Sequence, residues 1–188
     1  MSDWELVRRC KHDDRQAFRE LVERYQRKVV AIALGMLHDR EDALDVAQEA
    51  FSKVFTNINQ FKGESSFYTW LYRIVVNLSI DRQRQRSRRS SFERHQSAGE
   101  DDGDWIESIP NRDGLDPSDQ VADRERGRRI QAAIDELTPA HKAVILLKAV
   151  EGLSYDEISK VLQCSRGTVM SRLHYARKRL QARLPRDL

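Results

Sequence analysis

The sequence has little material for cross-links, membrane anchors or β-strands. Its two cysteines, Cys10 and Cys164, lack the spacing of metal ligands, so we expect reduced thiols in a cytoplasmic protein. The longest apolar run, Val29 to Leu37, is too short to span a bilayer, and no membrane insertion is expected. No alternation of apolar and polar residues is long enough for a convincing strand. The expected fold class is therefore all-α.

The signatures of catalysis are also missing. No nucleophile–base arrangement, glycine-rich phosphate loop or set of metal ligands stands out, so we expect no catalytic residue, no metal, no cofactor and no enzyme. A hydrolytic enzyme that uses the carboxylates between Asp39 and Glu49 is an alternative, which a screen for metal-dependent activity would test. The net charge is only +3, so any affinity for nucleic acid must come from how charge is distributed.

What the sequence does contain is a helix pair near its C-terminal end. Ser154, with Glu157 three residues later, forms a capping box before one amphipathic helix. After a break at residues 163–165, apolar residues recur at three- and four-residue spacing from Val169 to Leu184, which indicates a second helix with one buried face. Two helices joined by a tight turn make a helix-turn-helix candidate.

The opposite face of that second helix carries donors and positive charge. From Arg166 to Leu184 there are six Arg or Lys residues and no Asp or Glu. Such a strip suits a helix that lies in the major groove of DNA. A solvated amphipathic helix of a bundle is the alternative, but the capping box, the turn spacing and the lack of acids favour DNA binding.

Helical periodicity also runs through the first part of the chain. Apolar spacing predicts helices over Trp4–Cys10, from Phe18 to Met36, and from Phe67 to about Arg84. Another is expected from about Asp39, which can cap it, to Phe55, the last residue of its apolar side. A basic run and then an acidic run, Glu100–Asp104, follow without helical periodicity, as in a linker or a functional strap. Helices are expected again from Val121 to Leu137 and from Pro139 to Val150. We therefore predict a domain at 1–85, a flexible charged linker at 86–118 and a domain at 119–188.

Two sets of residues resemble a known family. The block from Gly152 to Ile158, with the residues around Gly167, Ser171 and Ala176, resembles the σ4 domain of bacterial extracytoplasmic-function (ECF) sigma factors of the sigma-70 family. The blocks 42–51 and 67–77 resemble the σ2 domain. The resemblance covers most of the chain in order and is closest to the RpoE-like members. It implies two small helical domains that bind core RNA polymerase and direct promoter-specific transcription initiation, with σ2 recognising the −10 element and the σ4 helix-turn-helix recognising the −35 element.

The resemblance also assigns roles to a polar face of the third predicted helix. It implies that this face docks on the clamp helices of the largest catalytic polymerase subunit, and an acidic, amide-rich face suits a basic partner. The residues concerned are Asp42, Asp45, Gln48 and Glu49. The alternatives are a solvated face or a metal cluster, the latter formed by Asp39, Glu41, Asp42 and Asp45.

The segment from Phe61 to Asn77 would capture the melted −10 element, because unpaired bases need stacking surfaces and hydrogen-bond partners. The candidate residues are Phe61, Lys62, Tyr68, Trp70, Arg73 and Asn77. Phe61 and Asn77 match family positions that build a pocket for an extruded base, and both lie off the apolar stripe. Core packing is the alternative for the aromatic residues; we expect it for Phe67, and it is equally plausible for Tyr68.

The second helix of the helix-turn-helix would contact the −35 duplex. The candidate residues are Arg166, Thr168, Ser171, Arg172, His174, Tyr175, Lys178 and Arg179. Met170 and Tyr175 stand where relatives often have basic residues. Replacing one basic residue that binds a phosphate lowers the salt dependence of binding by roughly one unit.

The implied partners are core RNA polymerase, promoter DNA and an anti-sigma factor that binds the apolar sides of both domains and could hold the protein at the inner membrane. The resemblance implies that Glu100–Asp104 threads the basic RNA exit path of the polymerase; a flexible tether is the alternative. A helix-turn-helix regulator that works without polymerase is the competing function. It predicts tight specific duplex binding by the chain alone, whereas a sigma factor binds weakly without polymerase, since a small σ4 offers few phosphate contacts.

Overall fold

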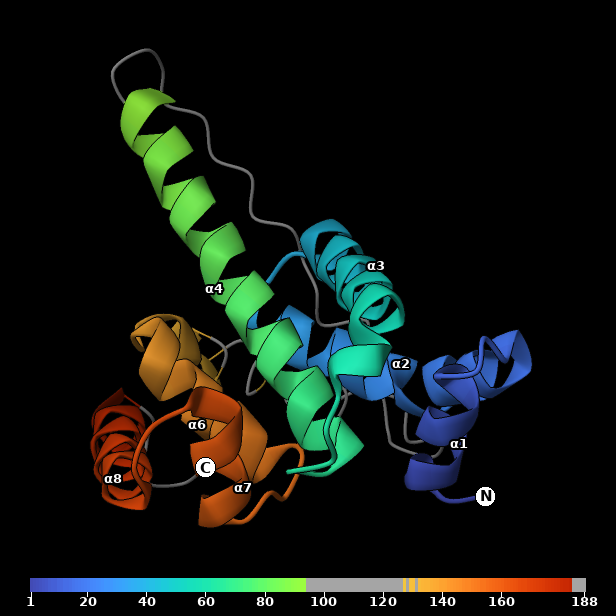
Figure 1. Cartoon of the computed structure of the whole chain (residues 1–188). Helices are drawn as coiled ribbons and strands as arrows, with labels where there is room; N and C mark the ends of the chain where they lie inside the picture. Colours follow the sequence, from blue (N-terminus) through green and yellow to red (C-terminus); the bar gives the residue numbers. More distant parts are fainter. Residues whose placement is uncertain (94–126, 128, 131, 184–188) are drawn as a thin grey trace, which may run out of the picture.

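The computed structural model describes residues 1–93, 127, 129–130 and 132–183, and the regular structure within these residues is helical. The described part of the chain therefore confirms the all-α prediction. Most of the expected linker, with the Glu100–Asp104 strap, and the start of the helix expected from Val121 lie outside the described residues. The helices form two groups that meet at α4 (Phe67–Glu93), the longest described helix and the last one of the first group (Figure 1).

The first group precedes and includes α4. It contains α1 (Asp3–Cys10), α2 (Arg15–Leu37), α3 (Arg40–Asn57) and the short 3-10 helix η1 (Ile58–Gln60). Side-chain oxygens of Ser2, Asp14 and Asp39 accept backbone N–H groups in the first turns of α1, α2 and α3. His38 ends α2 in the left-handed conformation, with φ of 55°. These local signals set the helix boundaries, and the cap by Asp39 confirms the prediction made for it.

Helix α4 runs further than predicted. It continues past Arg84 to Glu93, so that much of the basic run belongs to a helix. Arginine has a high helix propensity, and Arg82 and Arg86, four residues apart, face α3 together. Arg82 Nη1 lies 3.0 Å from Asp42 Oδ1, and Arg86 Nη2 lies 2.8 Å from Asp39 Oδ2. These pairs favour continued helix where the apolar stripe has already ended.

The second group contains the helix-turn-helix. Helical residues at 129–130 and 132–135 precede α6 (Pro139–Ala149), α7 (Tyr155–Leu162) and α8 (Arg166–Arg183). Thr138 caps α6, and both hydrogen bonds of the predicted capping box between Ser154 and Glu157 are present at α7. Gln163 adopts the left-handed conformation in the turn, with φ of 50°. The predicted helix-turn-helix is therefore confirmed.

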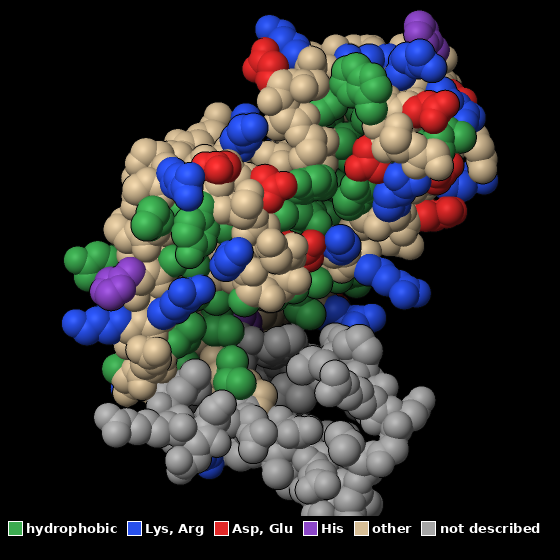
Figure 2. All heavy atoms as spheres, turned by 90° about the horizontal axis from the view of Figure 1, so that it is seen from below, with side chains coloured by type: hydrophobic (Ala, Val, Ile, Leu, Met, Phe, Trp, Pro, Cys, Tyr) green, Lys and Arg blue, Asp and Glu red, His purple; other side chains and the backbone are tan. Residues whose placement is uncertain are grey.

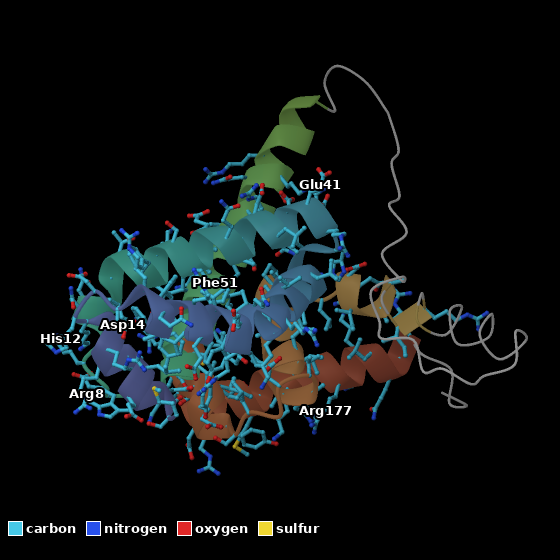
Figure 3. All side chains as sticks on the ribbon, turned by 90° about the vertical axis from the view of Figure 1, so that its right-hand side faces the viewer. Arg8, His12, Asp14, Glu41, Phe51 and Arg177 are labelled. Carbon is cyan, nitrogen blue, oxygen red and sulfur yellow. The ribbon has the colours of Figure 1, made fainter. Side chains whose placement is uncertain are left out.

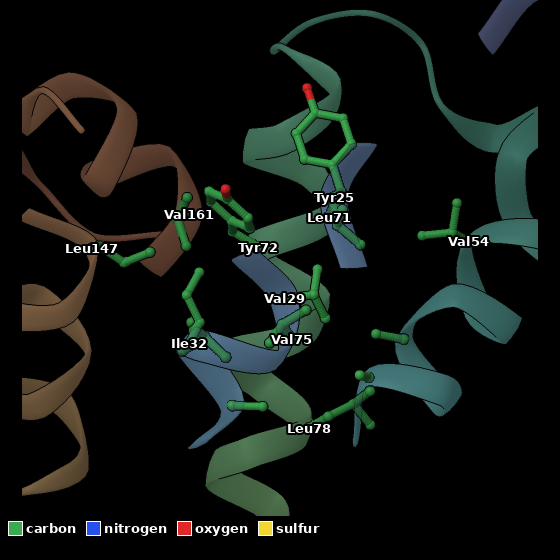
Figure 4. Close-up of a cluster of buried hydrophobic side chains, with 14 of the residues drawn as sticks. Tyr25, Val29, Ile32, Val54, Leu71, Tyr72, Val75, Leu78, Leu147 and Val161 are labelled. Atoms are coloured by element: carbon green, nitrogen blue, oxygen red, sulfur yellow. The ribbon is translucent and has the colours of Figure 1, made fainter. Parts of the chain in front are cut away.

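The two groups share one hydrophobic core. Ile32 of α2 and Tyr72 of α4 pack with Leu147 of α6 and Val161 of α7 (Figure 4). A methyl group placed on Gly35 of α2 would lie 2.7 Å from a terminal carbon of Leu146, so α2 and α6 approach closely. The helix-turn-helix is thus packed directly on the first group of helices.

One large apolar side chain is not where the sequence predicts it. Phe55 was expected on the buried side of its helix, yet it is 53% exposed. It stands in the last turn of α3, where it meets the ring of Phe18 edge-on with centroids 5.0 Å apart. Helical periodicity identifies the side on which a residue lies, but it does not show how far along the helix the neighbouring helix extends.

We expect Leu147→Ala to lower the free energy of unfolding by about 2–5 kcal/mol, because the Leu147 side chain is fully buried and its removal would leave a cavity. Val150→Ala is the matched control on the same segment, since Val150 is 56% exposed, and it should change that energy by less than about 0.5 kcal/mol. Chemical denaturation followed by circular dichroism measures both. Equal effects would contradict the described packing between the two groups.

Candidate polymerase and nucleic-acid interfaces

The polar face of α3 is partly neutralised from within the molecule. Asp42 is half-buried and paired with Arg82, while Asp45 is exposed and lies 3.6 Å from the same arginine. The N–H of Asp42, which donates to Asp39, is the main cause that lowers the pKa of Asp39, and the charge of Arg86 adds to it. Among the described residues no cluster of His, Cys, Asp or Glu could hold a metal. Arg82 and Arg86 thus pair with three of the four carboxylates that were considered as metal ligands, namely Asp39, Asp42 and Asp45.

The outer part of this face is open to solvent. Gln48 and Glu49 are exposed, and Glu49 pairs with Lys53 one turn later at 3.1 Å. Leu44, which is 46% exposed, stands one turn before Gln48. Sequence analysis did not single out Leu44, although its place outside the apolar stripe was a signal. Three of the four predicted docking residues, Asp45, Gln48 and Glu49, thus form an exposed patch with Leu44 at one end.

The loop between η1 and α4 carries the first of the predicted −10 residues. Phe61 was expected off the core, but it is 5% exposed. Its ring centroid lies 5.2 Å from that of Trp70, 6.2 Å from that of Phe67 and 6.4 Å from that of Trp4. Local periodicity could not show this burial, because Trp4 comes from the other end of the helical group. Phe67 is buried, as predicted.

Lys62 and Asn77 are the exposed members of this set. Lys62 follows the buried Phe61 in the loop, and Asn77 lies more than two turns into α4. Lys11 of α1 donates to the carbonyl oxygen of Phe61 over 2.6 Å, which fixes the start of the loop. The structure therefore leaves Lys62 and Asn77 accessible to solvent. The bond from Lys11 holds the start of the loop against the end of α1.

Two of the remaining −10 candidates, Tyr68 and Arg73, face the helix-turn-helix. The hydroxyl of Tyr68 donates to Glu157 of α7, and the guanidinium of Arg73 donates to the carbonyl oxygen of Lys160 over 2.7 Å and 3.2 Å. Trp70 is half-buried against Phe61. Part of the predicted −10 surface is therefore occupied by α7 in this arrangement.

A second tyrosine of α4 also contacts the second group of helices, at the junction between the two groups. Tyr72, 1% exposed, donates to Glu151 over 2.6 Å, and Lys28 lies 3.7 Å from the same carboxylate. Burial is the main cause that raises the pKa of Tyr72, and Glu151 raises it further. Sequence analysis missed this contact, because nothing local links residues that are 79 positions apart.

Glu157 serves both the cap of α7 and the junction. The hydrogen bond from Tyr68 is the main cause that lowers the pKa of Glu157, followed by the bonds from Ser154. These bonds to the ionised Glu157 therefore stabilise the folded protein fully above the pKa of an unpaired glutamate. That stabilisation is lost as the pH falls through the lowered pKa of Glu157.

A buried lysine lies at the far end of the junction. Lys142 of α6 is 2% exposed, and its Nζ is 3.1 Å from Asp135 Oδ1 and 2.8 Å from Nε2 of His38, at the end of α2. Burial is the main cause that lowers the pKa of Lys142, against the opposing effect of Asp135. Burial alone would raise the pKa of Asp135, but its bonds to His38 and Lys142 bring it below the usual value. An isolated lysine within the apolar run of α6 was the only sequence signal.

Most of the predicted −35 residues are exposed on α8. The exposed ones are Arg166, Ser171, His174, Tyr175, Lys178 and Arg179. Seen from below the view of Figure 1, basic side chains lie on both sides of the molecule, but acidic ones lie mostly away from the side of α8 (Figure 2). The face predicted to contact DNA is thus open while α7 is engaged with α4.

The other two members of the set are less available. Thr168 donates its backbone N–H to the hydroxyl of Ser165 over 3.1 Å, which caps α8. Arg172 is half-buried, and its Nη1 lies 3.9 Å from the sulfur of Cys164. Thr168 and Arg172 therefore have structural contacts in addition to any contact with DNA.

Comparisons with known proteins agree with this geometry. The model of sigma-70 region 2 matches residues 21–89, and that of sigma-70 region 4 matches residues 127–180. The chain is 36% identical to the ECF RNA polymerase sigma-E factor of Haemophilus influenzae, covering 98% of this chain and 96% of that protein. It is 35% identical to the ECF RNA polymerase sigma factor SigW of Bacillus subtilis, over 97% of this chain and 96% of that one. The chain therefore belongs to the sigma-70 family, as a sigma factor of the ECF group.

A solved structure shares the fold. The sigma factor RpoE of Bartonella quintana, in complex with the anti-sigma factor NepR, aligns with a TM-score of 0.70 at 23% identity, covering 91% of this chain and 98% of that chain. Sigma factors bind core RNA polymerase and direct it to promoters, and they are initiation factors rather than enzymes. None of the helices described here is long and apolar enough to cross a membrane.

We expect the double variant Tyr68→Phe/Tyr72→Phe to separate the two helical groups more readily. Each change removes a donor from a partly buried carboxylate, at a cost of about 1 kcal/mol or more. Small-angle X-ray scattering of the free protein should show a larger radius of gyration than for the wild type. Tyr175→Phe, on the exposed face of α8, is the control, and an unchanged radius in the double variant would show that these bonds do not hold the junction.

Proposed function

We propose that this sigma factor divides its work between its two helical groups. Residues 1–85 dock on the polymerase clamp and capture the melted −10 strand, residues 119–188 bind the −35 duplex, and residues 86–118 link them. The single observation that carries the proposal is the exposed basic face of α8 in a capped helix-turn-helix. The limits of the two sigma-70 matches support the division.

Charge and exposure support docking through α3. Asp45, Gln48 and Glu49 are exposed there, and an acidic surface attracts a basic partner over long range and sets its orientation. Arg82 and Arg86 pair with Asp39 and Asp42 at the start of α3, so Asp45, Gln48 and Glu49 form the exposed part of this face. A directional patch of this kind suits a lasting contact with one partner surface.

Capture of the −10 strand requires the two groups to separate. Tyr68 and Arg73 contact α7, so they can serve a base or a phosphate only after these contacts break. Lys62 and Asn77 are accessible already. Binding to polymerase would supply the energy for separation, because a partner shifts an equilibrium by its differential affinity for the two states.

We further propose control by an anti-sigma factor in the cytoplasm, with sequestration at the inner membrane as one form of it. The Bartonella quintana RpoE that shares this fold was solved with such a partner. An anti-sigma factor that prefers the joined arrangement would keep Tyr68 and Arg73 covered.

We expect Glu49→Arg to weaken association with core RNA polymerase at least tenfold, because juxtaposed like charges cost several kcal/mol. Glu23→Arg, an exposed position on α2, makes the same charge change away from the patch and should have little effect. Fluorescence anisotropy of labelled protein titrated with core polymerase measures both.

Runoff transcription on fragments of the source genome tests the function as a whole, and initiation identical with and without the chain would refute it.

We expect Lys178→Ala to weaken binding of the assembled holoenzyme to −35 duplexes and to lower the salt slope of log K by about one, as for removal of one phosphate-binding cation. Arg27→Ala, on the exposed side of α2, is the control. Fluorescence anisotropy of labelled promoter fragments, titrated with holoenzyme at several salt concentrations, measures both variants. The fragments are those that support initiation in the runoff transcription assay. Tight, specific duplex binding by the chain without polymerase would favour an independent regulator instead.

A further inference from the structure

Helix α1 is fixed firmly beside the loop that begins at Phe61. Leu6 and Val7 are fully buried beneath it. At its start, Asp3 accepts from the Tyr25 hydroxyl and from Arg24, the latter over 2.6 Å. At its end, Lys11 donates to the carbonyl oxygen of Phe61. A side chain on the outer face of α1 is therefore held in a set position relative to the loop.

Trp4 projects from this outer face onto the loop. A methyl group placed on Gly63 would lie 2.7 Å from Cζ3 and 2.9 Å from Cη2 of the indole, so the edge of the ring touches the loop backbone. Gly63 has φ of 77°, a conformation that suits glycine. Despite this contact Trp4 is 58% exposed. Most of the ring is therefore presented to solvent.

The two aromatic residues at this point differ in what they can offer a nucleic-acid base. Phe61 is 5% exposed and enclosed by Trp4, Phe67 and Trp70, so a base cannot lie on its ring unless its neighbours move. Trp4 is the large aromatic residue at this loop that a base could reach directly. Stacking on an aromatic ring tolerates any base, because every base has a π-face.

Exposed basic side chains lie on both of the segments that meet at the indole. Arg8 lies one turn after Trp4 on the same face of α1 and is exposed, and the exposed His12 follows in the turn after the helix. Figure 3 shows Arg8 and His12 at this end of the molecule. Lys62, in the loop itself, is exposed as well. Two exposed acids are also near: Glu5 follows Trp4 and lies about 100° around the helix from it, and Glu64 follows Gly63 in the loop.

We propose that Trp4 is a stacking surface for a base of single-stranded DNA that passes the Phe61–Ser66 loop, with Arg8 and Lys62 contacting the flanking phosphates. The inference rests on the proposed function, because it extends the −10 site onto α1. Exposed aromatic rings between cations are the usual arrangement of sites that bind single strands. The site would add affinity without sequence preference beside the more selective residues of the loop.

The competing explanation is that Trp4 only covers the backbone at Gly63. Trp4→Leu separates the two, because leucine keeps apolar cover over the loop but offers no ring. Trp4→Phe keeps a smaller ring, and Trp4→Ala removes both cover and ring. All three should bind core polymerase as the wild type does, since Trp4 is on α1 and the docking patch is on α3.

The test measures binding of a fluorescent 12-nucleotide thymidine strand to holoenzyme assembled with each full-length variant. We expect Trp4→Ala and Trp4→Leu to weaken binding by about 5- to 100-fold, the range seen when a stacked aromatic residue is removed. Trp4→Phe should stay within about threefold of the wild type. Arg8→Ala should lower the salt slope of log K by about 0.7, the value for one phosphate contact on a single strand.

Other outcomes decide against the proposal. Wild-type affinity in Trp4→Leu combined with weak binding in Trp4→Ala would show that Trp4 serves only as cover, and unchanged affinity in all three variants would show that no base stacks there. Thermal unfolding of each variant identifies any loss that comes from misfolding. If the chain bound the strand in a Trp4-dependent way but did not join core polymerase, the proposed function would fail and the stacking surface would stand.

Discussion

The packing of α6 and α7 against α2 and α4 is the constraint on which the rest of the structure depends. Ile32, Tyr72, Leu147 and Val161 meet there as one apolar core. This contact decides which faces are available: it turns the start of α4 inward, with Tyr68 and Arg73 against α7, and leaves the basic face of α8 outward. Exposure in this molecule therefore follows from how the two groups meet as well as from the pattern of each helix.

Local features could be predicted from the sequence because their causes are local. The cap by Asp39 and the capping box of Ser154 and Glu157 are both present, since each depends on residues three positions apart. The helix-turn-helix and the outward side of α8 follow from apolar spacing in the same way. For the −35 set, most side chains are indeed exposed, although what they contact remains a prediction.

Features that depend on distant residues could not be predicted. Phe61 is buried because Trp4 and Trp70 enclose it, and these two residues lie on the first and the last helix of the first group in chain order. Helix α4 outlasts its apolar stripe because Arg86 finds Asp39 on α3. The partners of Tyr68 and Tyr72 lie 89 and 79 positions away. Periodicity carries no information about such pairs.

Lys142 gives the junction a property that an all-hydrocarbon contact would lack. An ammonium group that is 2% exposed gives up its hydration, and the bonds to Asp135 and His38 repay only part of that cost. When the groups separate, water can hydrate this amine again. Separation therefore costs less free energy than it would at an entirely apolar contact. A partner that separates the two groups therefore has less free energy to supply.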